Sequence, residues 1–121
     1  MDTVALKADE ESVARLVDRF YTLVRSDDRL APIFNNAIAD WDAHLGAMRD
    51  FWSAVLTGTD RYHGCVMSAH FGLPMEAPDL DRFLDLFRPV ANETLPPPAA
   101  VNAIKVSEAI IDNLRRVVGH P

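Results

Sequence analysis

The amino-acid sequence predicts an all-α protein, and three observations support this class. Apolar residues recur at steps of three and four along most of the chain, the period of a helix buried on one face. No stretch alternates apolar and polar residues for long enough to form a strand. Prolines, glycines and aspartates interrupt the helical stripes. Because 121 residues are typical of one domain, we expect a single domain over 1–121, with a flexible N-terminal segment at 1–9.

The first expected helix covers roughly residues 10–25, where one apolar stripe gathers on a single face. The stripe consists of Val13, Leu16, Val17, Phe20, Tyr21 and Val24. The polar residues 26–28 predict a turn after it. The stretch 30–34 contains a proline and is too short for a long helix, so it predicts one or two tight helical turns.

A second long helix is expected over 41–56, where Asp40 can cap the start and Gly58 can end it. Its stripe contains Trp41, His44, Leu45, Met48, Trp52, Val55 and Leu56. The polar stretch 57–64 predicts a loop. A brief helix is expected over 66–71, before a proline ends it.

A third long helix is expected over 80–91, with a kink at Pro89 because proline removes one backbone hydrogen bond. Three consecutive prolines at 96–98 predict a hard break. The last helix is expected from about 99 to 118, and Gly119 ends it. The chain therefore predicts about four long helices and two short ones.

The composition excludes several classes of protein. The formal net charge of −6 argues against binding to nucleic acid or to anionic lipid, since both need clustered basic residues. No apolar run approaches the roughly 20 residues that span a bilayer, and the N-terminus lacks the pattern of a signal peptide. Cys65 is the only cysteine, which excludes an internal disulfide and favours a reducing compartment. We therefore expect a cytoplasmic protein.

Three polar residues interrupt apolar positions and are candidates for function. Tyr21 and His44 lie on the buried stripes of their helices, and His70 lies in a short apolar element. Each has an ordinary explanation, because a buried polar group is usually satisfied by a backbone or side-chain partner. The functional explanations are a metal ligand for a histidine, since neutral imidazole binds haem iron well, and a hydrogen bond into a cavity for Tyr21.

Aromatic residues come from most of the expected helices, which fits either a plain core or a cofactor pocket. Zinc is a weak alternative, because His44 and His70 lack a third and fourth ligand beyond Asp40. Ser53, Ser68 and Cys65 have no nucleophile motif around them. The five scattered glycines form no phosphate-binding loop.

Taken in order, several short motifs resemble the third group of truncated haemoglobins. The resemblance covers roughly residues 12–115, and the chain contains no Gly-Gly pair, as this group lacks the paired-glycine motifs of the other two. No single motif is decisive for this resemblance, but the whole set in this order supports it strongly. The motifs are Phe20-Tyr21, Pro32-Ile33-Phe34, Trp41 with His44, Phe51-Trp52, Arg61-Tyr62 with Gly64, His70-x-x-Leu73-Pro74, Asp81-Arg82-Phe83-Leu84 and Leu95-Pro96-Pro97.

The resemblance implies a shortened globin fold, in which a two-over-two helical sandwich surrounds haem b. His70 matches the ligand on one side of the iron, and Tyr21 and His44 match residues on the opposite, distal side. The remaining haem pocket would consist of Phe20, Phe34, Leu45, Met48, Trp52, Tyr62, Leu73, Phe83 and Phe87.

One departure from the family concerns Phe83, where the family usually has tryptophan. Tryptophan offers an indole N–H to a bound ligand, whereas phenylalanine has no donor. The polar surroundings of the ligand should therefore depend more on Tyr21 and His44.

The resemblance implies a protein for reversible binding or transport of oxygen, nitric oxide or carbon monoxide, and we expect it to be a monomer. An alternative is a redox enzyme, for nitric oxide dioxygenation or a peroxidase-like reaction, and turnover would then need an external reductase. No residue is assigned as catalytic. A helical interaction module without haem is a third possibility.

Overall fold

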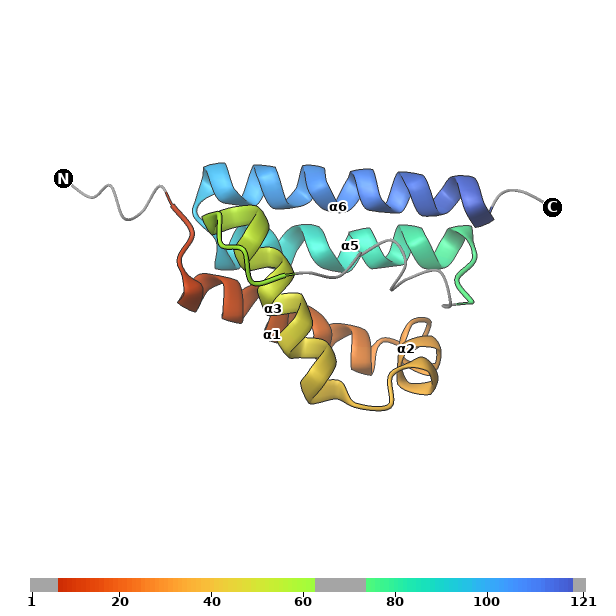
Figure 1. The fold of residues 1–121 in the computed structure, drawn as a ribbon. Coiled ribbons are helices and arrows are strands. Elements are labelled where there is room, and N and C mark those ends of the chain that lie inside the picture. Colours follow the sequence, from red (N-terminus) through yellow and green to blue (C-terminus); the bar gives the residue numbers. More distant parts are fainter. Residues whose placement is uncertain (1–6, 63–73, 119–121) are drawn as a thin grey trace.

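The computed structural model describes residues 7–62 and 74–118, and within these residues the chain forms five α-helices and no strand. They are labelled in Figure 1. Their bounds are α1 (Glu10–Ser26), α2 (Ala31–Ala37), α3 (Trp41–Thr57), α5 (Ala77–Thr94) and α6 (Pro97–Val118). The predicted all-α class is confirmed. The brief helix expected over 66–71, and the segment 1–6, lie outside the described residues.

The helices form two layers that pack across one another. α5 and α6 are antiparallel neighbours joined by a short turn, and α1 packs on α5 (Figure 1). α3 crosses α1, and the C-terminal half of α3 contacts α6. A pair of helices (α1 and α3) therefore lies over a second pair (α5 and α6), and their apolar faces meet in between.

Side-chain caps fix the starts of α1 and α3. Asp9 accepts a hydrogen bond from the Ser12 backbone N–H (2.8 Å), and the Ser12 hydroxyl oxygen accepts one from the Asp9 N–H (2.9 Å). Asp40 accepts from the Ala43 N–H at 3.1 Å. α3 ends at Gly58, whose φ of 79° is a left-handed conformation that glycine adopts without strain. Both predicted ends of α3 are confirmed.

Neither Pro89 nor Pro97 ends a helix in the structure. α6 begins at Pro97, two residues before the expected start, because a proline in the first turn gives up a backbone N–H that has no helical partner there. α5 runs as one helix through Pro89 to Thr94. The prolines near 97 therefore start a helix as well as separating it from α5.

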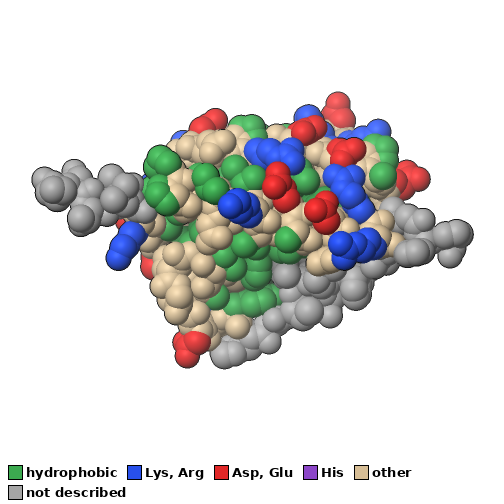
Figure 2. Space-filling model, turned by 90° about the horizontal axis from the view of Figure 1, so that it is seen from above, with side chains coloured by type: hydrophobic (Ala, Val, Ile, Leu, Met, Phe, Trp, Pro, Cys, Tyr) green, Lys and Arg blue, Asp and Glu red, His purple; other side chains and the backbone are tan. Residues whose placement is uncertain are grey.

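Ion pairs fix the register of α5 against α6. Arg88 Nη2 lies 2.9 Å from Glu108 Oε2, and Arg115 Nη2 lies 2.5 Å from Asp81 Oδ1. Both pairs join positions whose residue numbers add to the same value, as expected for an antiparallel pair of helices. Figure 2 shows basic and acidic side chains interspersed over the face above these helices. Exposed pairs of this kind add little stability, but they identify which turns lie side by side.

Two further pairs tie the turn after α1 to α5. Arg82 Nη2 contacts Asp27 Oδ1 at 2.7 Å, and Arg29 Nη1 contacts Asp79 Oδ1 at 2.8 Å. Both carboxylates are almost fully buried. They place α2 beside the start of α5, and Phe34 of α2 consequently reaches the core between the two layers.

Candidate functional site

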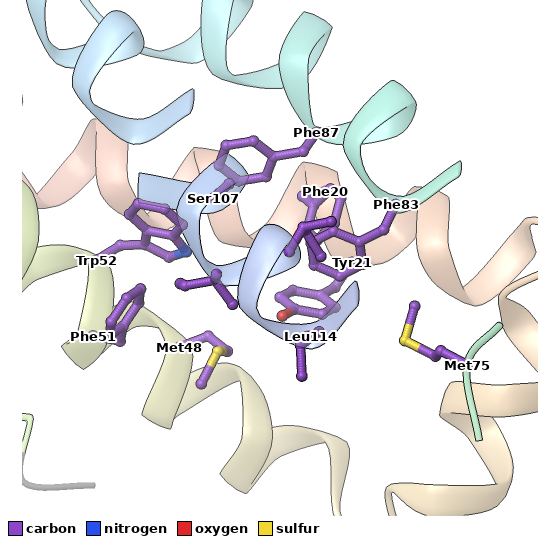
Figure 3. Close-up of a pocket in the computed structure, with 12 residues that line it drawn as sticks. Phe20, Tyr21, Met48, Phe51, Trp52, Met75, Phe83, Phe87, Ser107 and Leu114 are labelled. Carbon is purple, nitrogen blue, oxygen red and sulfur yellow. The ribbon is translucent and has the colours of Figure 1, made fainter. Parts of the chain in front are cut away.

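A largely apolar cavity lies between the two layers of helices (Figure 3). The space left open inside it is small, with a volume of about 30 Å³. Small-molecule sites are mostly apolar, with a few polar groups on the wall, and this lining has that character. The wall is formed by Phe20, Tyr21, Met48, Phe51, Trp52, Met75, Phe83, Phe87, Ser107, Ile110, Ile111 and Leu114.

The contacts between rings divide this cavity into two ends. At one end, which we call the tyrosine end, Tyr21 lies 6.5 Å from Phe34, and Phe34 stacks on Phe83 at 6.1 Å between ring centres. At the other end Trp52 stacks on Phe87 at 5.3 Å. Phe20 stands between them, since its ring contacts both Phe83 (4.8 Å) and Phe87 (5.1 Å) edge-on.

Tyr21 is the polar group at the tyrosine end. Its side chain is only 3% exposed, and burial raises the pKa of its hydroxyl because the charged phenolate would lose its solvation. The structure shows no hydrogen bond from this hydroxyl to any residue in 7–62 or 74–118. In Figure 3 the oxygen points away from α1, among the lining side chains. Tyr21 is thus a neutral donor on the cavity wall.

His44 lies next to Tyr21. The two rings are 5.0 Å apart and nearly perpendicular, at 88°, and the imidazole also stands edge-on to Trp41 at 5.6 Å. Arg25 covers that indole, 4.5 Å from its ring centre. His44 is partly buried and is not among the residues that line the cavity, so it lies beside the tyrosine end.

The structure brings six of the residues predicted for the site onto the cavity wall: Phe20, Tyr21, Met48, Trp52, Phe83 and Phe87. Three others contact residues of the wall, and Leu45 is partly buried on α3. Phe34 is fully buried behind Tyr21 and Phe83, the ring of His44 lies 5.0 Å from that of Tyr21, and Tyr62 packs on Phe51 at 5.3 Å. His70 and Leu73 lie outside the described residues.

Six wall residues were not among the predicted site residues. Ile110, Ile111 and Leu114 belong to the apolar face of α6, whose periodicity equally fits a plain core. Phe51 belongs to the Phe51-Trp52 motif of the family resemblance but was not assigned to the pocket, and Met75 follows a proline with no motif of its own. Ser107 gave a usable signal, because it lies one turn before Ile111 and interrupts the apolar face with a hydroxyl.

Within the described part of the chain, no three His, Cys, Asp or Glu side chains come together as a metal site. No helix there is long and apolar enough to cross a membrane.

The side chains of this wall suit a flat, largely apolar cofactor such as haem in their chemical character, and a group of that size would displace them from their present contacts, since the open volume is about 30 Å³. Aromatic, aliphatic and thioether side chains from both helical layers surround the cavity, and a neutral phenol faces inward. In haem proteins the polarity, donors and access of the distal pocket decide which ligand binds. A buried hydroxyl with a free donor is suited to that position.

Two pairs of crossed helices around an apolar cavity with an inward-facing phenol define the globin class. A family model described as "Bacterial-like globin" matches residues 7–115. The "Group 3 truncated hemoglobin ctb" of Campylobacter jejuni is 35% identical over 91 residues, covering 72% of this chain and 69% of that protein. The chain therefore belongs to the bacterial-like globins, and among them to the group III truncated haemoglobins.

Solved structures agree with this assignment. The crystal structure of the group III truncated hemoglobin from Campylobacter jejuni matches with a TM-score of 0.82 and 28% identity, covering 93% of this chain and 92% of that one. A thermostable hemoglobin from the actinobacterium Thermobifida fusca matches with a TM-score of 0.72 and 24% identity, over 94% of each chain. The second match supports the fold alone. Membership of this family implies that the chain binds small ligands through haem.

Proposed function

We propose that this protein holds haem b and reversibly binds a small gas, namely oxygen, nitric oxide or carbon monoxide. His70 would hold the iron, and Tyr21 and His44 would face the bound gas. The family supports the haem, and the resemblance of the His70 motif supports that residue's role. The observation that carries the distal assignment is the buried Tyr21 hydroxyl, which faces an apolar cavity without an acceptor in the described residues.

Haem supplies the metal that binds the gas, and the residues of the chain determine how firmly a polar ligand is held. Tyr21 donates a hydrogen bond to the partly negative end of the ligand, and the surrounding rings keep water away from it. A hydrogen bond in such low-dielectric surroundings is stronger than one in water. The His44 ring, 5.0 Å from that of Tyr21, orients the phenol and can approach the ligand from the same side.

The absorption spectrum tests the proposed function directly. Protein purified after expression with ample porphyrin is expected to be red, with a Soret band that shifts on reduction and again on adding carbon monoxide. A correctly folded but colourless protein would contradict the proposal. It would favour a helical module that binds no haem.

Phe83 offers a second test of the distal side, because its ring lies on the cavity wall. Phe83→Trp is expected to slow oxygen release by about tenfold or more, since the indole N–H adds a hydrogen bond to the same partly negative end of the ligand. Stopped-flow oxygen dissociation measures the effect. Phe83→Leu, which supplies no donor, serves as the control. Release from Phe83→Trp that is equal or faster would show that position 83 does not face the ligand.

A redox reaction is the second candidate function. The observation that favours it is the position of His44, an acid–base group next to Tyr21, since a peroxidase-like reaction needs a group that moves a proton at the ligand. Nitric oxide dioxygenation would further require an external reductase. Rapid turnover of peroxide, or of nitric oxide when a reductase is supplied, would favour this function over simple binding.

A further inference from the structure

An open groove with a volume of about 500 Å³ lies between α1 and α5, and it shares no lining residue with the cavity. Two ion pairs between these segments mark its course. At one end Arg19 of α1 lies 3.3 Å from Glu93 of α5. Just beyond the other end, Arg82 of α5 contacts Asp27, which follows α1, at 2.7 Å. The two helices are therefore antiparallel here, and the groove follows α5 for up to about 16 Å.

The floor of the groove is apolar. It is formed by Leu23 of α1 and by Leu86, Pro89 and Val90 of α5. Leu23 is 40% exposed, and it is one of two large apolar side chains that are exposed among the described residues. A single exposed leucine is ordinary, but an apolar strip with a polar rim is typical of a surface that binds another protein.

Pro89 gives the groove a backbone acceptor. It lies inside α5, where proline has no N–H to donate to the carbonyl of Asp85, four residues earlier. Asp85 lines the same groove, so its carbonyl oxygen lacks its helical donor at this surface. A proline inside a helix is destabilising, and Pro89 is exposed, so little burial offsets this cost. The acceptor is what Pro89 adds to the groove.

The groove is also acidic. Its charged lining residues are three carboxylates and one guanidinium, namely Asp18, Asp85, Glu93 and Arg19. Ion pairs with arginines occupy Asp18 and Glu93 at 3.1 and 3.3 Å. Asp85 is held less closely, because Arg88 lies 3.7 Å away and makes its shorter contact, 2.9 Å, with Glu108. Asp85 thus presents a carboxylate and a backbone carbonyl, and a cationic donor can bind both.

These features select the chemistry of the occupant. The carboxylates repel nucleic acid and anionic lipid, and the net charge of −6 disfavours a second copy of this chain. A small amine would stay largely in solvent, because the groove is open along its length. A helix of another protein fits better, since it places basic and apolar side chains one turn apart along the groove.

We propose that this groove is a docking site for a partner protein, which inserts a helix that carries basic side chains beside an apolar stripe. A lysine or arginine of that helix donates to the carboxylate and the backbone carbonyl of Asp85. The apolar side chains of the helix pack on Leu23 and Leu86. The groove is separate from the cavity, so docking does not depend on the proposed function.

A synthetic peptide tests the docking site. The probe is a helical peptide of about 15 residues, with leucines on one stripe and lysines on both sides of it. Isothermal titration calorimetry with the full-length protein is expected to show saturable binding, and a peptide with glutamate in place of lysine should not bind. Asp85→Lys is expected to weaken binding by about tenfold or more. Asp112→Lys is the matched control, because it makes the same change of charge at an exposed position of α6 outside the groove.

A second variant distinguishes docking from a structural role. Pro89→Ala restores the backbone N–H, so the carbonyl of Asp85 regains its helical bond. The variant is expected to melt several degrees above the parent, yet to bind the lysine peptide about two- to tenfold more weakly. A residue with a structural role alone would not combine higher stability with weaker binding.

Three results would overturn the docking site. One is that the lysine peptide shows no saturable binding to the parent protein. Another is that Asp85→Lys and Asp112→Lys weaken binding equally, since the peptide would then respond only to net charge. The third is self-association of the parent, measured by analytical ultracentrifugation, that Leu23→Ser abolishes. That result would identify a second copy of this chain as the occupant.

Discussion

Replacing His70 with alanine is expected to abolish stable binding of haem, so that the purified variant lacks the Soret absorption of the parent protein. The proposed function gives this residue the one bond between protein and iron. Without that bond the cofactor would be held only by apolar contact and by the ligand-side residues. Absorption spectra of the variant and parent, recorded after equal haem supplementation, measure the loss.

A glycine at position 70 distinguishes loss of the iron-binding side chain from loss of the fold. His70→Gly leaves room for free imidazole, and added imidazole is expected to restore much of the haem spectrum. His120→Ala, which changes a histidine outside the family motifs, is the matched control and should keep full absorption. An unaltered Soret band in His70→Ala would mean that another residue holds the iron.

Replacing Tyr21 with phenylalanine is expected to speed oxygen release by about ten- to a hundred-fold. The phenol is buried at 3% exposure on the cavity wall. A hydrogen bond to a charged or strongly polarised acceptor contributes roughly 1.5–3 kcal/mol, and each 1.4 kcal/mol corresponds to about tenfold. Stopped-flow oxygen dissociation at neutral pH measures the change. An unchanged rate would remove Tyr21 from the mechanism.

The protein supplies its own control for this substitution. Tyr62, the only other tyrosine, packs on Phe51 and is absent from the cavity wall, so Tyr62→Phe should leave oxygen release nearly unchanged.

The pH dependence of oxygen release gives a further check on Tyr21. Burial raises the pKa of Tyr21 above its usual value near 10, so the donor proton is lost only above that raised pKa. Oxygen release should therefore stay constant as the pH rises from about 7 to 10.

Helical periodicity predicted most of the fold, because each long helix has one buried face and clear end signals. The capping carboxylate of Asp40 and the left-handed Gly58 set the ends of α3 where the sequence indicated. The start of α6 was misplaced for a physical reason. A run of prolines reads as a break, yet the first turn of a helix tolerates proline, so α6 begins at Pro97.

The site was harder to predict from the sequence, because helical periodicity indicates which face of a helix is buried but not which neighbouring helix that face contacts. Family resemblance indicated Tyr21, Met48 and Phe83, and these residues share the cavity wall. It also indicated Phe34, which lies one ring further away, stacked behind Phe83. The face of α6 was understood only as core. Its contribution to the cavity became clear once the register with α5 was known, because that register decides whether Ser107 or Leu114 lies beside Phe87.

The side chains that enclose the cavity are also those that hold the two helical layers together. Phe20, for example, touches rings of α5 and stands beside the ring of its own neighbour, Tyr21. On the proposed function, the cofactor completes this interior, so its binding and the folding of the chain are thermodynamically linked. The amount of native protein would then follow the cell's supply of haem, and chains made during shortage would be the first to be degraded.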